Sequence, residues 1–222
     1  MTLKSSLDSL AKAFADFEIA VRLDDKTPLK NALALSESVE SFATTDGEPN
    51  VIVFADINNL KFINGKYGQT GGDAAIDKVG TQINDLFVTS LDAQAFRTSG
   101  DEFIILTQEE RLDEFRGLAA GFETLEVVIH EEVFTVAASF GIAANVNELA
   151  FEEIRERAET ACKKAKLKGG GICVEWTEDI ARTAIESLRS NCHSCNAATT
   201  VIVPVERNLT SVRYCGVCGE AL

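Results

Sequence analysis

A short run of apolar residues that ends in a carboxylate is the feature that most constrains the fold of this chain. The run is Val51-Ile52-Val53-Phe54-Ala55, and it lies between a polar loop, residues 44–50, and Asp56. An apolar, β-branched run of this length between polar segments is typical of a buried strand. Asp56 is therefore expected at the carboxyl end of a core strand.

Strand and helix patterns alternate along the rest of the domain. Apolar spacing predicts helices over 29–39, 72–88, 109–123 and 149–168, and strands over 95–97, 103–106, 125–130, 133–144 and 172–176. This order predicts an α/β (α+β) sandwich, in which helices pack against a mixed or antiparallel central sheet. Thr27 is the expected N-cap of the first of these helices, and Pro28 its first residue.

Composition and charge exclude several classes of function. The 222 residues are 45% hydrophobic, which is enough for a sizeable core. The formal net charge of -14 argues against a protein that mainly binds a nucleic-acid backbone or an anionic membrane. The sequence shows neither a leader segment nor an apolar run of roughly 20 residues, so we expect a cytoplasmic protein with no membrane partner.

The first 24 residues contain an apolar stripe at helical spacing. Its members are Leu3, Leu7, Leu10, Phe14, Phe17 and Val21. Their spacing is close to the roughly 3.5-residue period of a coiled coil, so residues 1–24 are predicted to form a helix. Two interpretations stay open: the stripe is a seam between two copies of the chain, or the helix lies on its own domain.

Two acidic clusters mark the place where chemistry is expected. Asp56 ends one strand, and Asp101 and Glu102 follow a tight Ser99-Gly100 turn between two others. If these strands are neighbours, the carboxylates converge at one edge of the sheet. Hard divalent cations such as Mg²⁺ bind such oxygens and promote attack of a hydroxyl on a phosphate, although acidic loop residues are also common without a metal.

Several segments resemble the motifs of one family in order and spacing. They are Ser99-Gly100-Asp101-Glu102-Phe103, Phe54–Asn64 followed by Tyr67–Asp73, Ser139–Ala143 and Ala158–Lys166. Over residues 25–178 the sequence is similar to the GGDEF domain, the family of diguanylate cyclases, whose palm-like fold is shared with adenylate cyclases and some polymerases. The resemblance implies a catalytic domain that condenses two GTP into cyclic di-GMP and pyrophosphate.

The resemblance also implies the metal ligands and the catalytic residues. Asp56 and Asp101 would hold Mg²⁺ or Mn²⁺, together with the main-chain carbonyl of Ile57. Glu102 would serve as a further ligand or would accept the proton of the attacking 3′-hydroxyl.

Four further residues are implied in substrate binding. Asn64 and Asp73 would hydrogen-bond the guanine edge, which favours GTP over ATP. Lys61, Lys166 and the amides of the turn after Asp56 would bind the phosphates. The other interpretations are structural: Asn64 and Asp73 as helix or turn caps, and Lys166 as part of a basic patch that complements the end of a helix.

The chain departs from the family pattern in several places. Asn58 and Gln69 replace an acidic residue and a histidine, and Gly170 replaces an arginine that would contact phosphate. The motif at the start of the domain, Asp25–Ala32, lacks its arginine. The inhibitory RxxD sequence expected at residues 90–93 is absent, which predicts weak feedback by the product.

Four cysteines near the C-terminus form two CxxC pairs. Cys192 and Cys195 are separated by 19 residues from Cys215 and Cys218, which is the spacing of a four-thiolate zinc site. Because about 30 residues cannot hold a core alone, a structural Zn²⁺ is expected there.

The surrounding C-terminal sequence is similar to a zinc ribbon. Residues 199–203 and 211–214 are predicted to form the hairpin between the two pairs, within a ribbon that spans 191–222. Residues 179–190 are expected to form a connecting helix. Such ribbons bind a protein or a nucleic acid, or support dimerisation.

Three functions are compatible with these features. The first is a homodimeric diguanylate cyclase in which each protomer binds one GTP. The second is a GTP-binding adaptor without turnover, which the lost arginines and Asn58 favour and which would contact a protein or nucleic acid through the ribbon. The third is a related palm nucleotidyltransferase with a different product, against which a guanine-binding Asp73 argues.

Overall fold

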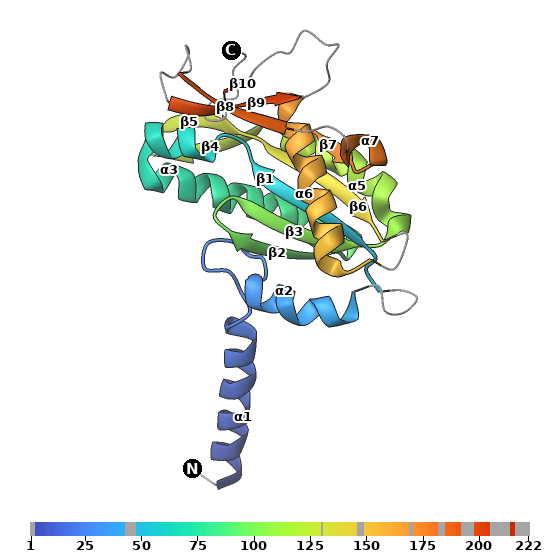
Figure 1. The fold of residues 1–222 in the computed structure, drawn as a ribbon. Helices are drawn as coiled ribbons and strands as arrows, with labels where there is room; N and C mark the ends of the chain where they lie inside the picture. The colour runs from blue at the N-terminus through green and yellow to red at the C-terminus, as the bar shows by residue number, and fades with distance from the viewer. Residues whose placement is uncertain are drawn as a thin grey trace.

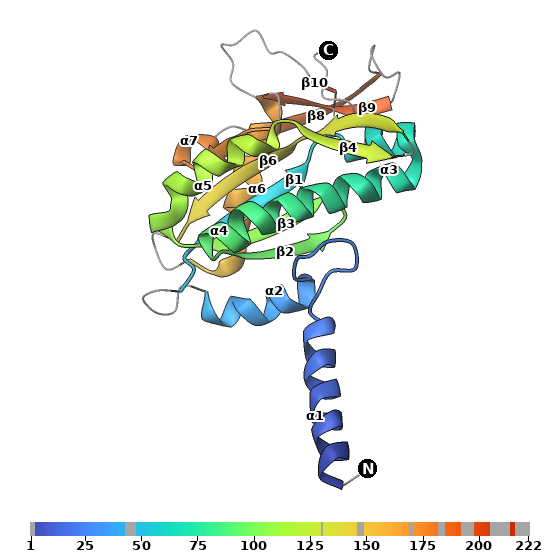
Figure 2. The same cartoon turned by 180° about the vertical axis from the view of Figure 1, so that it is seen from behind.

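The fold is built around one mixed sheet with helices on both faces (Figures 1 and 2). The structure is a computed structural model that describes residues 3–42, 48–129, 131–145, 149–168, 171–181, 185–191, 198–204 and 214–215. The mixed sheet with helices on both faces confirms the predicted α/β (α+β) sandwich. Within these residues, no helix is both long enough and apolar enough to cross a bilayer.

The central sheet has the strand order β2-β3-β1-β6-β7. β1 (Val51–Ile57) lies in the middle, and its neighbours β3 (Glu102–Thr107) and β6 (Ala138–Ala144) run antiparallel to it. β2 (Gln94–Ser99) pairs antiparallel with β3, whereas β7 (Cys173–Glu175) pairs parallel with β6. The apolar run at the start of β1 is buried, which confirms the predicted core strand.

Helices pack on both faces of the sheet, and alternate residues of β1 pack against the helices of one face and then the other. Val53 and Ala55 pack in the same core cluster as residues of α3 and α5, and Ile52 and Phe54 pack with residues of α2 and α6. Figure 1 shows the α6 side and Figure 2 the α3 side. The helices are α1 (Leu3–Ala20), α2 (Ala32–Ser38), α3 (Leu60–Ile83), α4 (Thr89–Leu91), α5 (Leu112–Ala119), α6 (Phe151–Leu167) and α7 (Glu178–Ala181), with a π-helical turn over Asn84–Val88 and 3-10 turns over Val39–Ser41, Glu109–Arg111 and Ala120–Phe122.

Gly141 lets α6 lie directly on the sheet. A Cβ atom at this position of β6 would lie 2.0 Å from the carbonyl oxygen of Ala158 and 2.2 Å from the amide nitrogen of Cys162. Real side chains do not approach backbone atoms so closely, so only glycine allows this contact. The position of α6, which carries Lys166, therefore depends on a missing side chain in β6.

The N-terminal helix stands away from the domain. α1 projects from the body of the molecule (Figure 1), and its stripe residues Leu7, Phe14 and Phe17 are 57%, 63% and 64% exposed. The helix is confirmed, but the interpretation in which it lies on its own domain is wrong. Its apolar stripe has no cover within the part of the chain that the structure describes.

Two sequence expectations near the sheet need correction. α2 begins after Asn31, whose side chain accepts from the amide of Ala34 at 3.1 Å, while Thr27 instead donates its hydroxyl to Asp24. The predicted strand 133–144 is two strands, because β5 (Glu132–Val136) forms a separate hairpin with β4 (Leu125–Ile129). The break falls at residue 137, whose carbonyl accepts from the turn after β1 and not from a strand.

The connecting helix predicted over 179–190 is wrong for most of its length. α7 ends at Ala181, and β8 (Ile185–Asn191) pairs antiparallel with β9 (Ala198–Pro204). Pairing with a distant β-branched run thus overrides the local helical pattern. β9 also pairs with β10 (Tyr214–Cys215), as the predicted hairpin requires. Three of the four proposed zinc ligands, Cys192, Cys195 and Cys218, lie outside the described residues.

Candidate active site

Three carboxylates approach one another where β1 ends. In the antiparallel register Asp56 lies opposite Glu102 on β3, and opposite Ser139 on β6. The amide of Ile57 donates to the carbonyl of Asp101 at 3.1 Å, which joins the tip of the β2–β3 hairpin to the end of β1. The two acidic clusters found in the sequence therefore meet at one edge of the sheet, because β1 and β3 are neighbours.

Asp56 is the most strongly perturbed carboxyl group at this edge. Burial raises its pKa to about 6, and the negative charges of Asp101 and Glu102 act in the same direction. Lys166 from α6 forms an ion pair with Asp56 Oδ1 and partly opposes the increase. The edge thus holds a carboxylate that is costly to ionise without a cation.

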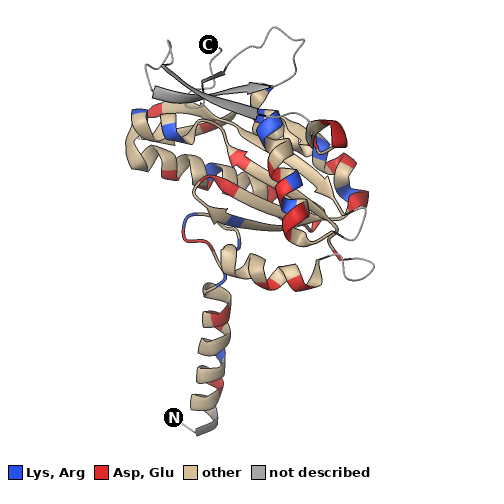
Figure 3. Cartoon of the chain, in the orientation of Figure 1, with Lys and Arg blue, Asp and Glu red and all other residues tan. Residues whose placement is uncertain are grey.

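Lys166 is set apart from the other charged residues of α6. Acidic and basic residues are interspersed along this helix (Figure 3), and several form ion pairs, such as Arg155 with Glu152 and Lys163 with Glu159. Lys166 instead reaches across to β1. This contact with Asp56 is not explained by a patch that only complements the end of the helix.

The donor set fits a divalent cation that also binds phosphate. The described residues contain no cluster of three or more acidic, histidine or cysteine side chains close enough to form a complete metal cage. Mg²⁺ usually takes only one or two carboxylates and leaves its other positions to water and phosphate. Two carboxylates, Asp56 and Asp101, lie close enough here to interact, which agrees with that preference, and a buried carboxylate with a raised pKa is the expected partner for a cation.

The Ser99-Gly100 turn between β2 and β3, here called the signature turn, is held by the largely buried side chain of Arg97. Arg97 donates from Nε and Nη2 to the carbonyl of Gly100, at 3.1 and 2.9 Å, and its Nη1 lies 2.9 Å from Asp24 Oδ2. The side chains of Arg97 and Asp24 are each only 10% exposed. The turn that carries Asp101 is therefore fixed to the loop before α2.

A kink in α3 brings the two proposed guanine-binding residues together. Asn64 and Asp73 both lie inside α3, so neither is a helix cap, and a straight helix would place them about 14 Å apart on opposite faces. At Gly68 the backbone has φ 71 and ψ -178, a conformation open essentially to glycine alone. Beyond the kink, a Cβ on Gly72 would lie 1.8 Å from Asn64 Oδ1, so the two halves of α3 touch.

The polar atoms of these two residues differ in their contacts. Asn64 Oδ1 is buried and has no hydrogen-bond donor among the described residues. Asp73 Oδ1 accepts from Lys26 Nζ at 2.7 Å and from Gln69 Nε2 at 3.0 Å. These hydrogen bonds lower the pKa of Asp73, which is therefore ionised at neutral pH. Asn64 thus offers an acceptor oxygen that has no donor, and Asp73 offers an ionised carboxylate.

The turn between β1 and α3 supplies the amino end of a helix. Asn59 adopts a left-handed conformation with φ 58, and α3 starts at the next residue. The amides of Phe62 and Ile63 donate to the Asn59 carbonyl, so the amides of Leu60 and Lys61 are the ones with no carbonyl partner within the helix. Asn58 faces inward: its Oδ1 accepts from the hydroxyl of Ser139 at 2.8 Å, and that hydroxyl accepts from the amide of Gly171. Lys61, in the first turn of α3, is exposed and makes no ion pair with the described residues.

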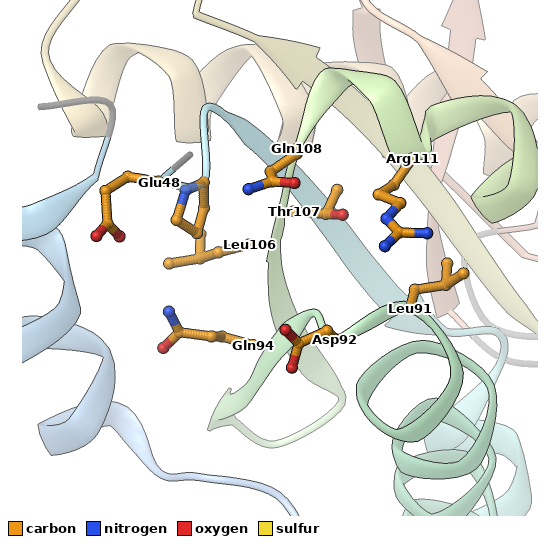
Figure 4. A pocket seen from close by; sticks show the side chains of 9 residues that line it. Glu48, Leu91, Asp92, Gln94, Leu106, Thr107, Gln108 and Arg111 are labelled. Carbon is orange, nitrogen blue, oxygen red and sulfur yellow. The ribbon is translucent and has the colours of Figure 1, made fainter. Parts of the chain in front are cut away.

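The described residues line a pocket at each of two places near the edges of the sheet. One of about 460 Å³ lies beside the β1–α3 turn and includes Asn58, Asn59 and Phe62. The other, of about 250 Å³, lies at the far end of β3 from Asp101, where Asp92 and Arg111 face the space shown in Figure 4. The first pocket adjoins the candidate site and the second does not.

A comparison with protein families decides the identity of this arrangement. Residues 21–171 match the family model described as "Diguanylate cyclase, GGDEF domain", and these residues make up more than half of the chain. The chain belongs to the GGDEF domain family. The GGDEF match overlaps the stretch 25–178 over which the sequence resemblance was found.

Curated relatives of this GGDEF chain match it at low identity. Diguanylate cyclase DgcS of Shewanella oneidensis is 31% identical over 150 residues, which are 64% of this chain and 45% of that protein. Diguanylate cyclase DgcP of Pseudomonas aeruginosa is 28% identical over 176 residues, 74% of this chain and 26% of that protein. The chain spans less than half the length of these relatives.

Solved structures show the same GGDEF fold. The coiled coil and GGDEF domain of DgcB from Caulobacter crescentus, solved with c-di-GMP, gives a TM-score of 0.67 at 19% identity and covers 78% of this chain and 94% of that one. Diguanylate cyclase SiaD from Pseudomonas aeruginosa, solved with its activator SiaC, gives 0.61 at 21% identity and covers 78% and 70%. At these identities the likeness shows the fold alone.

Sequence reasoning missed several residues that shape the GGDEF site. The sequence predicts that the motif at the start of the domain begins at Asp25, whose side chain is 83% exposed, whereas the partner of Arg97 in the structure is Asp24, which is 10% exposed. Lys26 and Ser139 were not singled out either. An arginine shortly before the signature turn was the available signal, but its aspartate partner is 73 residues away in the sequence.

Proposed function

We propose that this GGDEF domain is a diguanylate cyclase that joins two GTP molecules into cyclic di-GMP. In each of the two steps, the 3′-oxygen of one GTP bonds to the α-phosphorus of the other. The bond from that phosphorus to the oxygen bridging the α- and β-phosphates breaks, and pyrophosphate leaves. The observation that carries the proposal is the position of Asp56 opposite Glu102, beside the turn that carries Asp101.

The carboxylate edge provides the groups that this reaction needs. Asp56, Asp101 and the Ile57 carbonyl would hold Mg²⁺ or Mn²⁺, and the bound ions would neutralise phosphate charge and favour ionisation of the 3′-hydroxyl. Glu102 would accept the hydroxyl proton, because it lies on the neighbouring strand directly opposite Asp56. Lys166 would exchange its contact with Asp56 for the phosphates.

The kinked helix provides the nucleotide pocket. The Asp73 carboxylate would accept from the N1–H and the amino group of guanine, and the buried Asn64 Oδ1 would accept the second hydrogen of that amino group. Adenine cannot make these contacts, so the site would prefer GTP over ATP. The first amides of α3 and the exposed Lys61 would bind the β- and γ-phosphates.

The reaction requires two copies of the chain. Each protomer offers one nucleotide site, so two sites must face each other for two GTP molecules to react. The exposed apolar stripe of α1 would join the copies as a coiled coil, because its burial against a second helix removes several large apolar side chains from water. We therefore propose a homodimer.

Product analysis tests the proposal directly. The protein is incubated with GTP and Mg²⁺ or Mn²⁺, and the products are identified by mass spectrometry. Asp101→Asn should abolish product formation, whereas the matched change Asp92→Asn, at the far end of β3, should leave it intact. Cyclic di-GMP supports the proposal; a different linear or cyclic product formed from mixed nucleotides would instead assign a related nucleotidyltransferase.

A second candidate function is a GTP-binding adaptor without turnover. Two observations favour it. Lys166 forms an ion pair with Asp56, and Asn58, which accepts from Ser139, stands where the family pattern has another acidic residue. Both reduce the negative charge available to metals. GTP binding without release of pyrophosphate, by protein shown to be correctly folded, would favour this function over the cyclase.

We also propose that the C-terminal cysteines hold a structural Zn²⁺. The two CxxC pairs support this, as does the pairing of Cys215 with Val201 in a strand that begins shortly after Cys195. The resulting ribbon would contact a protein or a nucleic acid. Inductively coupled plasma mass spectrometry should find one zinc per chain, and much less in Cys215→Ser. Zinc-free protein with four reactive thiols would contradict the assignment.

A further inference from the structure

The proposed guanine-binding residue Asp73 has a cationic neighbour to which the proposed function assigns no role. Lys26 Nζ lies 2.7 Å from Asp73 Oδ1, and Gln69 donates to the same oxygen. The side chains of Lys26 and Asp73 are 33% and 39% exposed, and ion pairs at this exposure contribute little to stability. The main effect of the contact is therefore local, because it places a positive charge at the nucleotide pocket.

Lys26 is anchored to the same turn that carries the catalytic carboxylates. Its amide donates to Asp24 Oδ1 at 3.1 Å, and the hydroxyl of Thr27 donates to that oxygen at 2.9 Å. Asp24 in turn pairs with Arg97, which holds the carbonyl of Gly100. The backbone at Lys26 is thus held relative to the Ser99-Gly100 turn, and its side chain reaches Asp73 from there.

A carboxylate alone cannot bind the whole guanine edge. Guanine offers the N1–H and an amino group as donors, but its O6 atom, next to N1, is an acceptor. A carboxylate has no donor for O6, whereas an ammonium group has three. The pair of Asp73 and Lys26 therefore offers an acceptor and a donor side by side, as the N1–H and O6 of guanine require.

We propose that Lys26 donates to O6 of the guanine whose N1–H Asp73 accepts, and that it is a further specificity-determining residue. This inference rests on the proposed binding of GTP. Adenine carries an amino group in place of O6, so the ammonium would face a donor and oppose its binding. Lys26 would thus select for guanine and against adenine at the same atom position.

A double comparison of residue and base tests this role. Dissociation constants are measured for GTP and 6-thio-GTP, which keeps the N1–H and amino group but replaces O6 with a poorer acceptor. The wild-type chain should bind GTP about tenfold more tightly than 6-thio-GTP. Lys26→Met should weaken GTP binding about tenfold and leave 6-thio-GTP almost unchanged, so that the preference disappears.

Two controls separate the contact with O6 from other effects. Lys66→Met removes a charge from an exposed position on α3 and should leave both constants unchanged. ITP lacks the amino group but keeps O6, so Lys26→Met should weaken ITP and GTP binding equally.

Each remaining outcome has a defined meaning. Tighter GTP binding by Lys26→Met would show that Lys26 competes with guanine for Asp73, and equal losses for GTP and 6-thio-GTP would show a general charge effect; both overturn the inference. If the wild type makes cyclic di-GMP but binds GTP and 6-thio-GTP equally well, the inference is overturned and the proposed function stands. Failure of the wild type to bind GTP would overturn the proposed function as well.

Discussion

Asp56 is the residue with the strongest expected role in catalysis, and ionisation of its buried carboxyl group lowers the stability of the fold. Its pKa of about 6 lies above the usual value of 3.8 for an aspartate because the carboxyl group is buried. The folded state therefore favours the protonated form. The stability that this preference provides is complete below about pH 3.8 and is lost as the pH rises through about 6.

Asp56→Asn should stabilise the metal-free protein near neutral pH while abolishing turnover. The neutral amide removes the buried charge, so the free energy of unfolding at pH 7.5 should rise by up to about 3 kcal/mol. At pH 4.5 the gain should be much smaller, because wild-type Asp56 is then mostly protonated. Urea unfolding in EDTA at both pH values measures this; a variant less stable than wild type at pH 7.5 would show that the ion pair with Lys166 outweighs burial.

Among single residues, those with local signals were the ones that the sequence could predict. Asp101 and Glu102 follow a recognisable turn, and Asp56 follows an apolar run, so their positions on the sheet edge were accessible from pattern alone. Asp24, Arg97 and Ser139 act through contacts between distant segments. No local pattern marks such partners, and they emerge only when the sheet order is known.

At the scale of elements, the kink in α3 is the feature on which the proposed nucleotide binding depends. Gly68→Ala places a side chain where φ is 71, which should cost about 1–3 kcal/mol or straighten the helix. Straightening separates Asn64 from Asp73, and strain at residue 68 makes the kinked form less populated, so affinity for GTP should fall at least tenfold in a calorimetric titration. An unchanged affinity would show that the kink does not build the pocket.

The same helix contains a matched control. Gly65 is exposed, lies at an ordinary helical φ, and a Cβ there meets no atom within 4 Å. Gly65→Ala should therefore stabilise the protein slightly, by about 0.5–1 kcal/mol, and leave GTP binding unchanged. The contrast separates the backbone conformation at residue 68 from a general effect of replacing glycine in α3.

The second element-scale prediction concerns α1. Phe14→Glu places a charge in the exposed apolar stripe and should shift the chain from dimer to monomer, as measured by sedimentation. Cyclase activity at low protein concentration should fall at least tenfold and partly recover as the concentration rises. Ala15→Glu adds the same charge beside the stripe and should change neither quantity; equal effects of both variants would argue against a coiled-coil seam.

At the scale of the whole molecule, the far end of the sheet bears on regulation. The residues in the place of the inhibitory motif, 90–93, include Leu91 and Asp92 at the pocket of Figure 4, and the arginine of that motif is replaced by Ser90. We expect cyclic di-GMP at a tenfold excess over GTP to reduce the initial rate less than twofold. Strong inhibition that is not competitive with GTP would reveal a second product site.

The overall fold was more predictable than its connections. Binary patterns predicted the central strands and the main helices, because burial on a sheet imposes periods that a sequence records directly. The division of 133–144 into two strands and the strand β8 were missed, since both depend on which distant segment the backbone pairs with. Family motifs indicated the candidate site because they combine residues from several elements.

The close contact between Gly141 and α6 also affects the ion pair between Lys166 and Asp56. A methyl group at position 141 would act as a wedge, and α6 would have to move outward with Lys166 on it. The ammonium would then lose its reach to Asp56, although neither charged residue had changed. Related chains that carry a larger residue at this position should therefore also differ at the residue corresponding to Lys166, so the two sites should vary together during evolution.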